Sequence, residues 1–307
     1  MKFDASKTAF GRHETFALRY SWLTKGYQKN IASKNKDIFI SDNATVELGV
    51  GKNMVSSIRY WLRASQMMEA DSNQITRLGE LVFNKKTGFD PFLEDEATLW
   101  LVHWLIATNS ELATSWFWFF NKFHKPEFTQ TELTTALNDW VKENVQSKVA
   151  SGTLKNDALL VPKMYAYAKD NLRISLEDKL DIPLAQLKLI NQSPDGKVYQ
   201  CKPSVRPSLP VEIVGYAVLQ IMHEKNSTSM PIEDLMYSKD NYSAVGSVFR
   251  LTENELIAKL EILTSKYKEL FDIRESAGIH QLYVKEKRAE ETMLVDYYQA
   301  ANKEVAA

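Results

Sequence analysis

The chain has 307 residues, 44% of them hydrophobic, and a formal net charge of −1 at pH 7. This length suits two or three domains, and the near-neutral charge excludes a protein that attracts nucleic acid through a global positive field. The charge is uneven, because residues 1–65 carry a net +6 and the remainder carries −7. Such a basic front fits a nucleic-acid surface beside a partner-binding remainder, and chance clustering explains it equally well.

Cysteine usage and hydropathy limit the compartment. Cys201 is the single cysteine, so the chain can form neither an intramolecular disulfide nor a thiolate zinc cluster. No signal peptide begins the chain, and we expect a reducing, cytoplasmic location. The most apolar run, 97–120, is interrupted by His103 and by polar residues at 109–111. It is too broken to span a bilayer, so we expect two buried helices and no membrane association.

The first predicted helix covers residues 14–25 and ends at Gly26, because Phe16, Tyr20 and Leu23 recur at helical spacing. Arg12 and His13 precede this predicted helix, and Glu14 is its first residue. The second histidine of a zinc-protease motif is absent, so this polar group is expected to tie the helix to the next motif. Arg12 is also a candidate phosphate contact.

Residues 41–63 predict a helix-turn-helix, with helices at 43–48 and from Lys52 past Arg63, joined by a turn at 49–51. Short polar and cationic side chains near the start of the second helix are typical of a major-groove reader. The predicted outward face carries Lys52, Asn53, Ser56, Ser57, Arg59 and Arg63. The alternative is a packing module of three helices that touches no DNA.

The polar stretch 84–91 predicts a turn or short wing, whose Lys85 and Lys86 would touch phosphate. Helices are then expected at 94–108 and 110–123. Their tryptophans and phenylalanines recur at helical spacing, which indicates core packing more than a base-stacking platform.

A second helix-turn-helix is predicted at 128–156. Its helices cover 130–142 and 153–170, the latter kinked by Pro162. Lys155 and Asn156 would face a phosphate backbone, or they would only cap and solvate the helix. Predicted strands at 187–190 and 197–201, around a turn at 193–196, would form its wing.

The last third predicts helices at 211–223, 232–237 and 252–265, a hairpin at 271–284 and a final helix at 286–304. This order is that of a winged-helix module. The predicted fold is therefore mainly α, with tandem helix-turn-helix or winged-helix modules and short β-hairpin wings. The predicted domains are an N-terminal helix-turn-helix domain at 1–125, a central winged-helix-like module at 126–205 and a C-terminal one at 206–307.

No catalytic motif is present. Residues 48–53 lack the first glycine and the Ser/Thr of a phosphate-binding loop, and neither paired histidines nor a dinucleotide fingerprint occurs. We therefore expect no catalytic residues, metal site or cofactor, although dispersed carboxylates would leave no local trace.

Several motifs together resemble a bacterial family named as domain of unknown function four thousand and seven. The more specific ones are Phe10–Phe16, Val46–Val55, Ser57–Trp61 and Asp90–Asp95, and Asp181–Leu184 and Ser276–Gln281 extend the resemblance over most of the chain. The resemblance implies a place in anti-phage defence islands, often beside a phosphoadenosine-phosphosulfate-reductase-like enzyme and other parts of DNA phosphorothioation systems.

The sequence thus favours a non-catalytic, DNA-binding accessory subunit of a phosphorothioation or phage-defence system, with double-stranded DNA and the reductase-like enzyme as partners. One alternative is an adaptor that binds a sulfur-transfer enzyme or an ATPase, which the acidic remainder favours. Another is a transcriptional regulator of the defence operon, which would act as a symmetric dimer.

Overall fold

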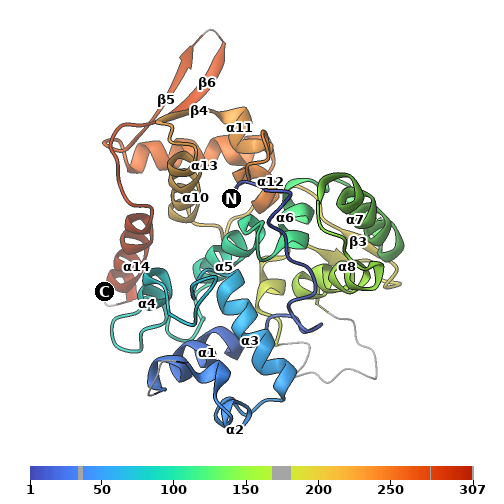
Figure 1. Cartoon of the computed structure of the whole chain (residues 1–307). Helices are drawn as coiled ribbons and strands as arrows, with labels where there is room; N and C mark the ends of the chain where they lie inside the picture. The colour runs from blue at the N-terminus through green and yellow to red at the C-terminus, as the bar shows by residue number, and fades with distance from the viewer. Residues whose placement is uncertain (34–36, 168–180, 277, 306–307) are drawn as a thin grey trace. The chain divides into compact units, whose positions relative to one another are not determined.

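The computed structural model describes residues 1–33, 37–167, 181–276 and 278–305 (Figure 1). The chain divides into two compact units. The larger unit comprises residues 4–119 and 123–202, and the smaller comprises residues 1–3, 120–122 and 203–307. The predicted division into three modules stays a prediction beside this observed one.

The larger unit is mainly helical. Its helices are α1 (Tyr20–Ala32), η1 (Ile38–Ile40), α2 (Ala44–Leu48), α3 (Lys52–Ala64), α4 (Arg77–Phe83), α5 (Glu96–Thr108), α6 (Thr114–Asn121), α7 (Gln130–Asn144), α8 (Ser151–Tyr165) and η2 (Pro183–Leu187). The last two residues of α6 belong to the smaller unit. Three short strands, β1 (Glu127–Thr129), β2 (Asn191–Gln192) and β3 (Val198–Gln200), form an antiparallel sheet in the order β1-β3-β2.

The core of this unit is built on α5 and α6. Every α5 residue from Ala97 to Thr108 is buried, and so is Trp116 of α6. This confirms two buried helices in the most apolar run and confirms that its aromatic side chains are core. No helix within the described ranges has the length and hydropathy needed to cross a membrane.

The helix-turn-helix prediction is confirmed as local structure. α2 and α3 follow the predicted bounds within one residue, and Gly49 between them has φ +63°, a left-handed conformation that glycine adopts without strain. Leu48, Val55 and Ile58 are buried on the facing sides of the two helices.

The first helix was placed too early by the sequence pattern. α1 runs from Tyr20 to Ala32, whereas Glu14 and Thr15 both have positive φ and belong to a loop. Gly26 does not end the helix. It lies inside α1, where a β-carbon would come within 2.7 Å of Ile58 and Leu62 side-chain atoms, so its missing side chain permits close packing on α3.

One other local prediction is wrong. Residues 187–190 are the end of η2 and a loop in which Leu189 and Ile190 are buried, rather than a strand, and β2 begins only at Asn191. Residues 84–91, predicted as a turn or short wing, form a turn without a strand. α8 ends at Tyr165, so the predicted helix stops short at residues 166–167, and its predicted end at 168–170 lies outside the described residues.

The smaller unit contains α10 (Val211–Glu224), β4 (Ser229–Pro231), α11 (Ile232–Met236), α12 (Val245–Phe249), α13 (Glu253–Lys266), β5 (Phe271–Ser276), β6 (Ile279–Val284) and α14 (Glu291–Val305). Its three strands form an antiparallel sheet in the order β4-β6-β5. In the smaller unit, strand β4 is followed by helices α11–α13 and then by the β5–β6 hairpin. In the larger unit, strand β1 is followed by helices, including α7 and α8, and then by β2 and β3.

Candidate nucleic-acid interface

The solvent-facing part of α3 is its first turn. Lys52, Asn53 and Ser56 are exposed, as predicted, and glycines at 49 and 51 leave the approach open. A cation, an amide and a hydroxyl on one helical turn can contact phosphates and base edges.

The rest of the predicted outward face of α3 is not free. Ser57 is fully buried, which overturns its predicted outward position. Arg59 and Arg63 are half-buried, and both donate hydrogen bonds to the Asn73 side chain. Its Oδ1 atom accepts from Arg59 Nε at 2.7 Å and from an Arg63 guanidinium nitrogen at 3.1 Å, and Ser72 O accepts from Arg63 at 2.9 Å.

The pKa of Arg63 reflects its partly buried position. Burial lowers the pKa of the Arg63 guanidinium, and the neighbouring Arg59 charge lowers it further. Sequence spacing placed both arginines correctly on one helix face but gave no sign of the 69–74 loop that covers it.

The loop that carries Arg12 lies on α8. Gly11 N–H donates to Asp157 Oδ1 at 3.0 Å, and a β-carbon on Gly11 would meet the Thr153 side chain at 2.7 Å. Gly11 also has φ +71°, a backbone conformation that residues with a side chain rarely adopt. Both the close approach of Thr153 and the positive φ therefore favour glycine at this position. Arg12 is exposed and directly follows this contact in the sequence.

His13 and Asp157 form the buried centre of this contact. His13 Nδ1 accepts the Thr15 N–H at 3.1 Å, so the ring proton is on Nε2, which donates to Asp157 Oδ1 at 2.8 Å. Ser115 Oγ donates to Asp157 Oδ2 at 2.6 Å. The Asp157 carboxylate therefore accepts three hydrogen bonds and joins the N-terminal loop, α6 and α8.

Aromatic rings extend the network to α3. The His13 ring stacks on Trp61 at 6.3 Å and meets Trp116 edge-on at 5.5 Å, and Trp61 Nε1 donates to Phe16 O at 3.0 Å. The predicted polar network of Arg12, His13 and Glu14 with the helix-turn-helix is therefore not formed: His13 bonds to Asp157 on α8, and it meets α3 through the rings of Tyr60 and Trp61. Arg12 and Glu14 are exposed and lie outside this buried link.

α8 presents a cationic outer face. Lys155 and Asn156 are exposed, as predicted, and so is Lys163 two turns later. The helix passes through Pro162, which has no N–H for the carbonyl of Ala158. Gln130 Nε2 donates to that carbonyl at 2.9 Å and keeps it satisfied.

Three further lysines of this unit are exposed. Lys85 and Lys86 lie in the turn after α4, where Asn84 Oδ1 accepts the Lys86 N–H at 2.9 Å. Lys197 is exposed beside the β2–β3 turn. Sequence reasoning missed Lys163 and Lys197, although helical and hairpin spacing would have grouped them with Lys155.

Solved structures resemble this chain over almost its whole length. Two crystal structures of SspB, one of them with a bound magnesium ion, resemble this chain with a TM-score of 0.83 and 29% identity. Each alignment covers 96% of this chain and 89% of the SspB chain. No curated protein matches the sequence. The family model described as "Protein of unknown function (DUF4007)" matches residues 10–298. Since that match spans almost the whole chain, the protein belongs to this family.

Proposed function

We propose that this protein is a non-catalytic, DNA-binding accessory subunit of a bacterial DNA phosphorothioation or related phage-defence system. Membership of the family supports the defence context, because the family resemblance implies genes of that kind, and the likeness to SspB fits it. Its partners would be double-stranded DNA and a reductase-like or other protein of the same system.

The outer face of α8 is the observation that carries the proposal. The described order β1, α7, α8, η2, β2, β3, with sheet order β1-β3-β2, supports reading this part as a winged-helix-like module. In helix-turn-helix folds the second helix of the motif enters the major groove, and in this proposal that helix is α8. Its exposed Lys155, Asn156 and Lys163 suit phosphate and base-edge contacts.

Neighbouring cations fit the same role. Lys197 is exposed beside the β2–β3 turn, which would be the wing, and Arg12 follows Gly11, which contacts α8. The exposed first turn of α3, with Lys52 and Asn53, and the turn bearing Lys85 and Lys86 are secondary contacts in this proposal.

Duplex binding at two salt concentrations tests the proposal. Affinity for a DNA duplex should fall steeply between about 50 mM and about 200 mM salt, because each neutralised phosphate releases counterions. Replacing both Lys155 and Lys163 by glutamate should weaken binding at least tenfold and flatten the salt slope by about one unit per lost phosphate contact.

The matched control is Lys29→Glu, which reverses an exposed charge on α1. It should leave affinity and slope within error of the wild type. A folded wild-type protein that binds no duplex at low salt would rule out a DNA-binding role.

A second candidate function is a magnesium-dependent action on DNA. The observation that favours it is the magnesium ion bound in one of the similar SspB structures. Magnesium is often held by one or two carboxylates together with water and substrate phosphates, which leaves little trace in a protein alone. Conversion of supercoiled plasmid to a nicked form with magnesium, and not with EDTA, would favour this function over the non-catalytic one.

A further inference from the structure

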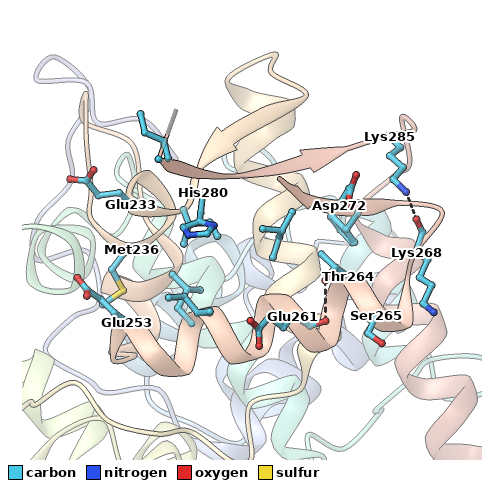
Figure 2. A pocket seen from close by; sticks show the side chains of 17 residues that line it. Glu233, Met236, Glu253, Glu261, Thr264, Ser265, Lys268, Asp272, His280 and Lys285 are labelled. Carbon is cyan, nitrogen blue, oxygen red and sulfur yellow. Dashed lines mark hydrogen bonds between the residues drawn. The ribbon is translucent and has the colours of Figure 1, made fainter. Parts of the chain in front are cut away.

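The smaller unit contains a groove of about 950 Å³ between α13 and the β5–β6 hairpin, with α11 at one end (Figure 2). Its floor and walls are largely apolar. They include Ile232, Met236, Leu256, Ile257, Ile273 and Ile279.

Large apolar side chains remain in contact with solvent here. Ile257 on α13 is 41% exposed and Ile279 on the hairpin is 51% exposed, and both line the groove. Isolated exposed isoleucines are ordinary, but two that line one groove from different elements form a patch, and such patches mark interaction sites.

The rim of the groove is acidic on the α13 and α11 side. Glu253 and Glu261 on α13 and Glu233 on α11 line it. Within the described ranges no cation pairs with the Glu261 carboxylate, whereas Lys239 Nζ is 3.9 Å from Glu233. Figure 2 shows Glu261 on the helix side of the space and His280 on the hairpin side.

The opposite end holds the two lysines of the groove. Lys285 Nζ donates to the backbone carbonyl of Lys268 at 2.5 Å, and both residues line the groove there. Asp272 is the lining carboxylate near these lysines. Glu253, Glu261 and Glu233 form the acidic part away from them, which borders the exposed Ile257.

We propose that this groove binds a segment of a partner protein that carries large apolar side chains flanked by lysine or arginine. The apolar side chains would cover Ile257 and Ile279, and the cations would pair with Glu253, Glu261 and Glu233. This surface is separate from the DNA contacts proposed above, and its test does not depend on them.

The same charges argue against other occupants. α13 follows the helix and strand order in which α8 stands, yet its exposed face offers Glu253, Ile257 and Glu261 where α8 offers lysines. Carboxylates on that face repel phosphates, which disfavours nucleic acid. A second copy of the groove placed face to face would oppose acidic rim to acidic rim, which disfavours a symmetric dimer here.

Synthetic peptides of defined chemistry provide the test, with the full-length protein and fluorescence polarisation. Two lysine peptides contain the same leucines and lysines, one with leucine at i, i+3, i+4 and i+7 and one with leucine alternating, which covers helical and extended binding. For each, one counterpart replaces lysine by glutamate and another replaces leucine by serine.

At least one lysine peptide should bind tenfold or more tightly than both of its counterparts. Ile257→Lys and Glu261→Lys, each in the full-length protein, should weaken that binding at least tenfold. Ile262→Lys and Glu269→Lys are the matched controls, because both residues are exposed nearby and neither lines the groove. They should bind like the wild type.

Three results would overturn the proposal. One is the absence of binding by either lysine peptide. Another is equal binding of the lysine and glutamate or of the leucine and serine versions. The third is a concentration-dependent dimer, measured by light scattering, that Ile257→Lys abolishes, since that would assign the groove to a second copy.

Discussion

At the scale of single residues, the least expected feature is a carboxylate that no sequence motif marked. Asp157 is 1% exposed and accepts hydrogen bonds from Gly11, His13 and Ser115. A buried carboxylate is tolerated only when such donors satisfy it. The family-like motif at residues 10–16 is therefore explained by packing on α8, and catalysis need not be invoked for it.

Replacing this carboxylate should be costly. Asp157→Ala leaves two side-chain donors and a backbone N–H without their acceptor, so we expect a loss of about 3 kcal/mol in the free energy of urea unfolding. Asp157→Asn should lose less, because an amide oxygen still accepts and the Ser115 hydroxyl can turn to accept from the amide. Asp139→Ala on exposed α7 is the control and should change stability by less than about 0.5 kcal/mol. An alanine variant as stable as this control would contradict the role assigned to Asp157.

At the scale of elements, features that depend on a few neighbouring residues could be predicted from the sequence, whereas contacts between distant segments could not. The Gly49 turn, the Thr252 N-cap of α13 and the β5–β6 hairpin are local, and all three were placed correctly. The start of α1 was misplaced because Asp181, far along the chain, accepts the Tyr20 N–H at 3.0 Å. Arg59 was expected outside because the loop that contains Asn73 could not be foreseen from helical spacing.

The N-terminus of α7 is a local element with a predicted pH response. Thr129 and Glu132 form a capping box, and the hydrogen bond from Lys125, followed by those from Thr129, lowers the pKa of Glu132 from 4.5 to about 2. The unfolded chain binds the proton more readily, so the stabilisation is complete above pH 4.5 and is lost as the pH falls from 4.5 to about 2.

Glu132→Gln isolates this response, because the amide oxygen still accepts the Thr129 N–H and does not titrate. Wild type should exceed the variant in free energy of unfolding at about pH 6, and the gap should narrow at about pH 3. Urea titrations at the two pH values measure it. A gap that is independent of pH would show that Glu132 acts there only as a cap.

At the scale of the whole molecule, the chain order and the compact units do not coincide. Residues 120–122, at the end of α6, belong to the smaller unit with residues 203–307. Asn121 is fully buried, and its Oδ1 accepts the N–H of Ala244, which precedes α12, at 3.2 Å. The smaller unit is therefore completed by a helix that belongs mostly to the larger one.

Asn121→Ala should loosen the smaller unit by about 1–3 kcal/mol, since the Ala244 N–H loses a buried acceptor. Hydrogen exchange measured by mass spectrometry should show faster exchange in α12. Asn144→Ala, at the exposed end of α7, is the matched control and should leave α12 unchanged. Unchanged exchange in both variants would mean that α6 contributes nothing to the local stability of α12.

The two units each place helices between a first strand and a hairpin, and α8 and α13, one from each unit, carry opposite surface charge. α8 exposes Lys155 and Lys163, and α13 exposes Glu253 and Glu261. If that charge decides what each helix binds, substitutions on one helix should change DNA binding or peptide binding, but not both. Reversing the α8 lysines should weaken DNA binding at least tenfold and leave the lysine–leucine peptide bound as before, and Ile257→Lys should do the opposite. Duplex and peptide titrations on the same samples measure both, and a variant that abolishes both would show that the two surfaces are coupled rather than independent.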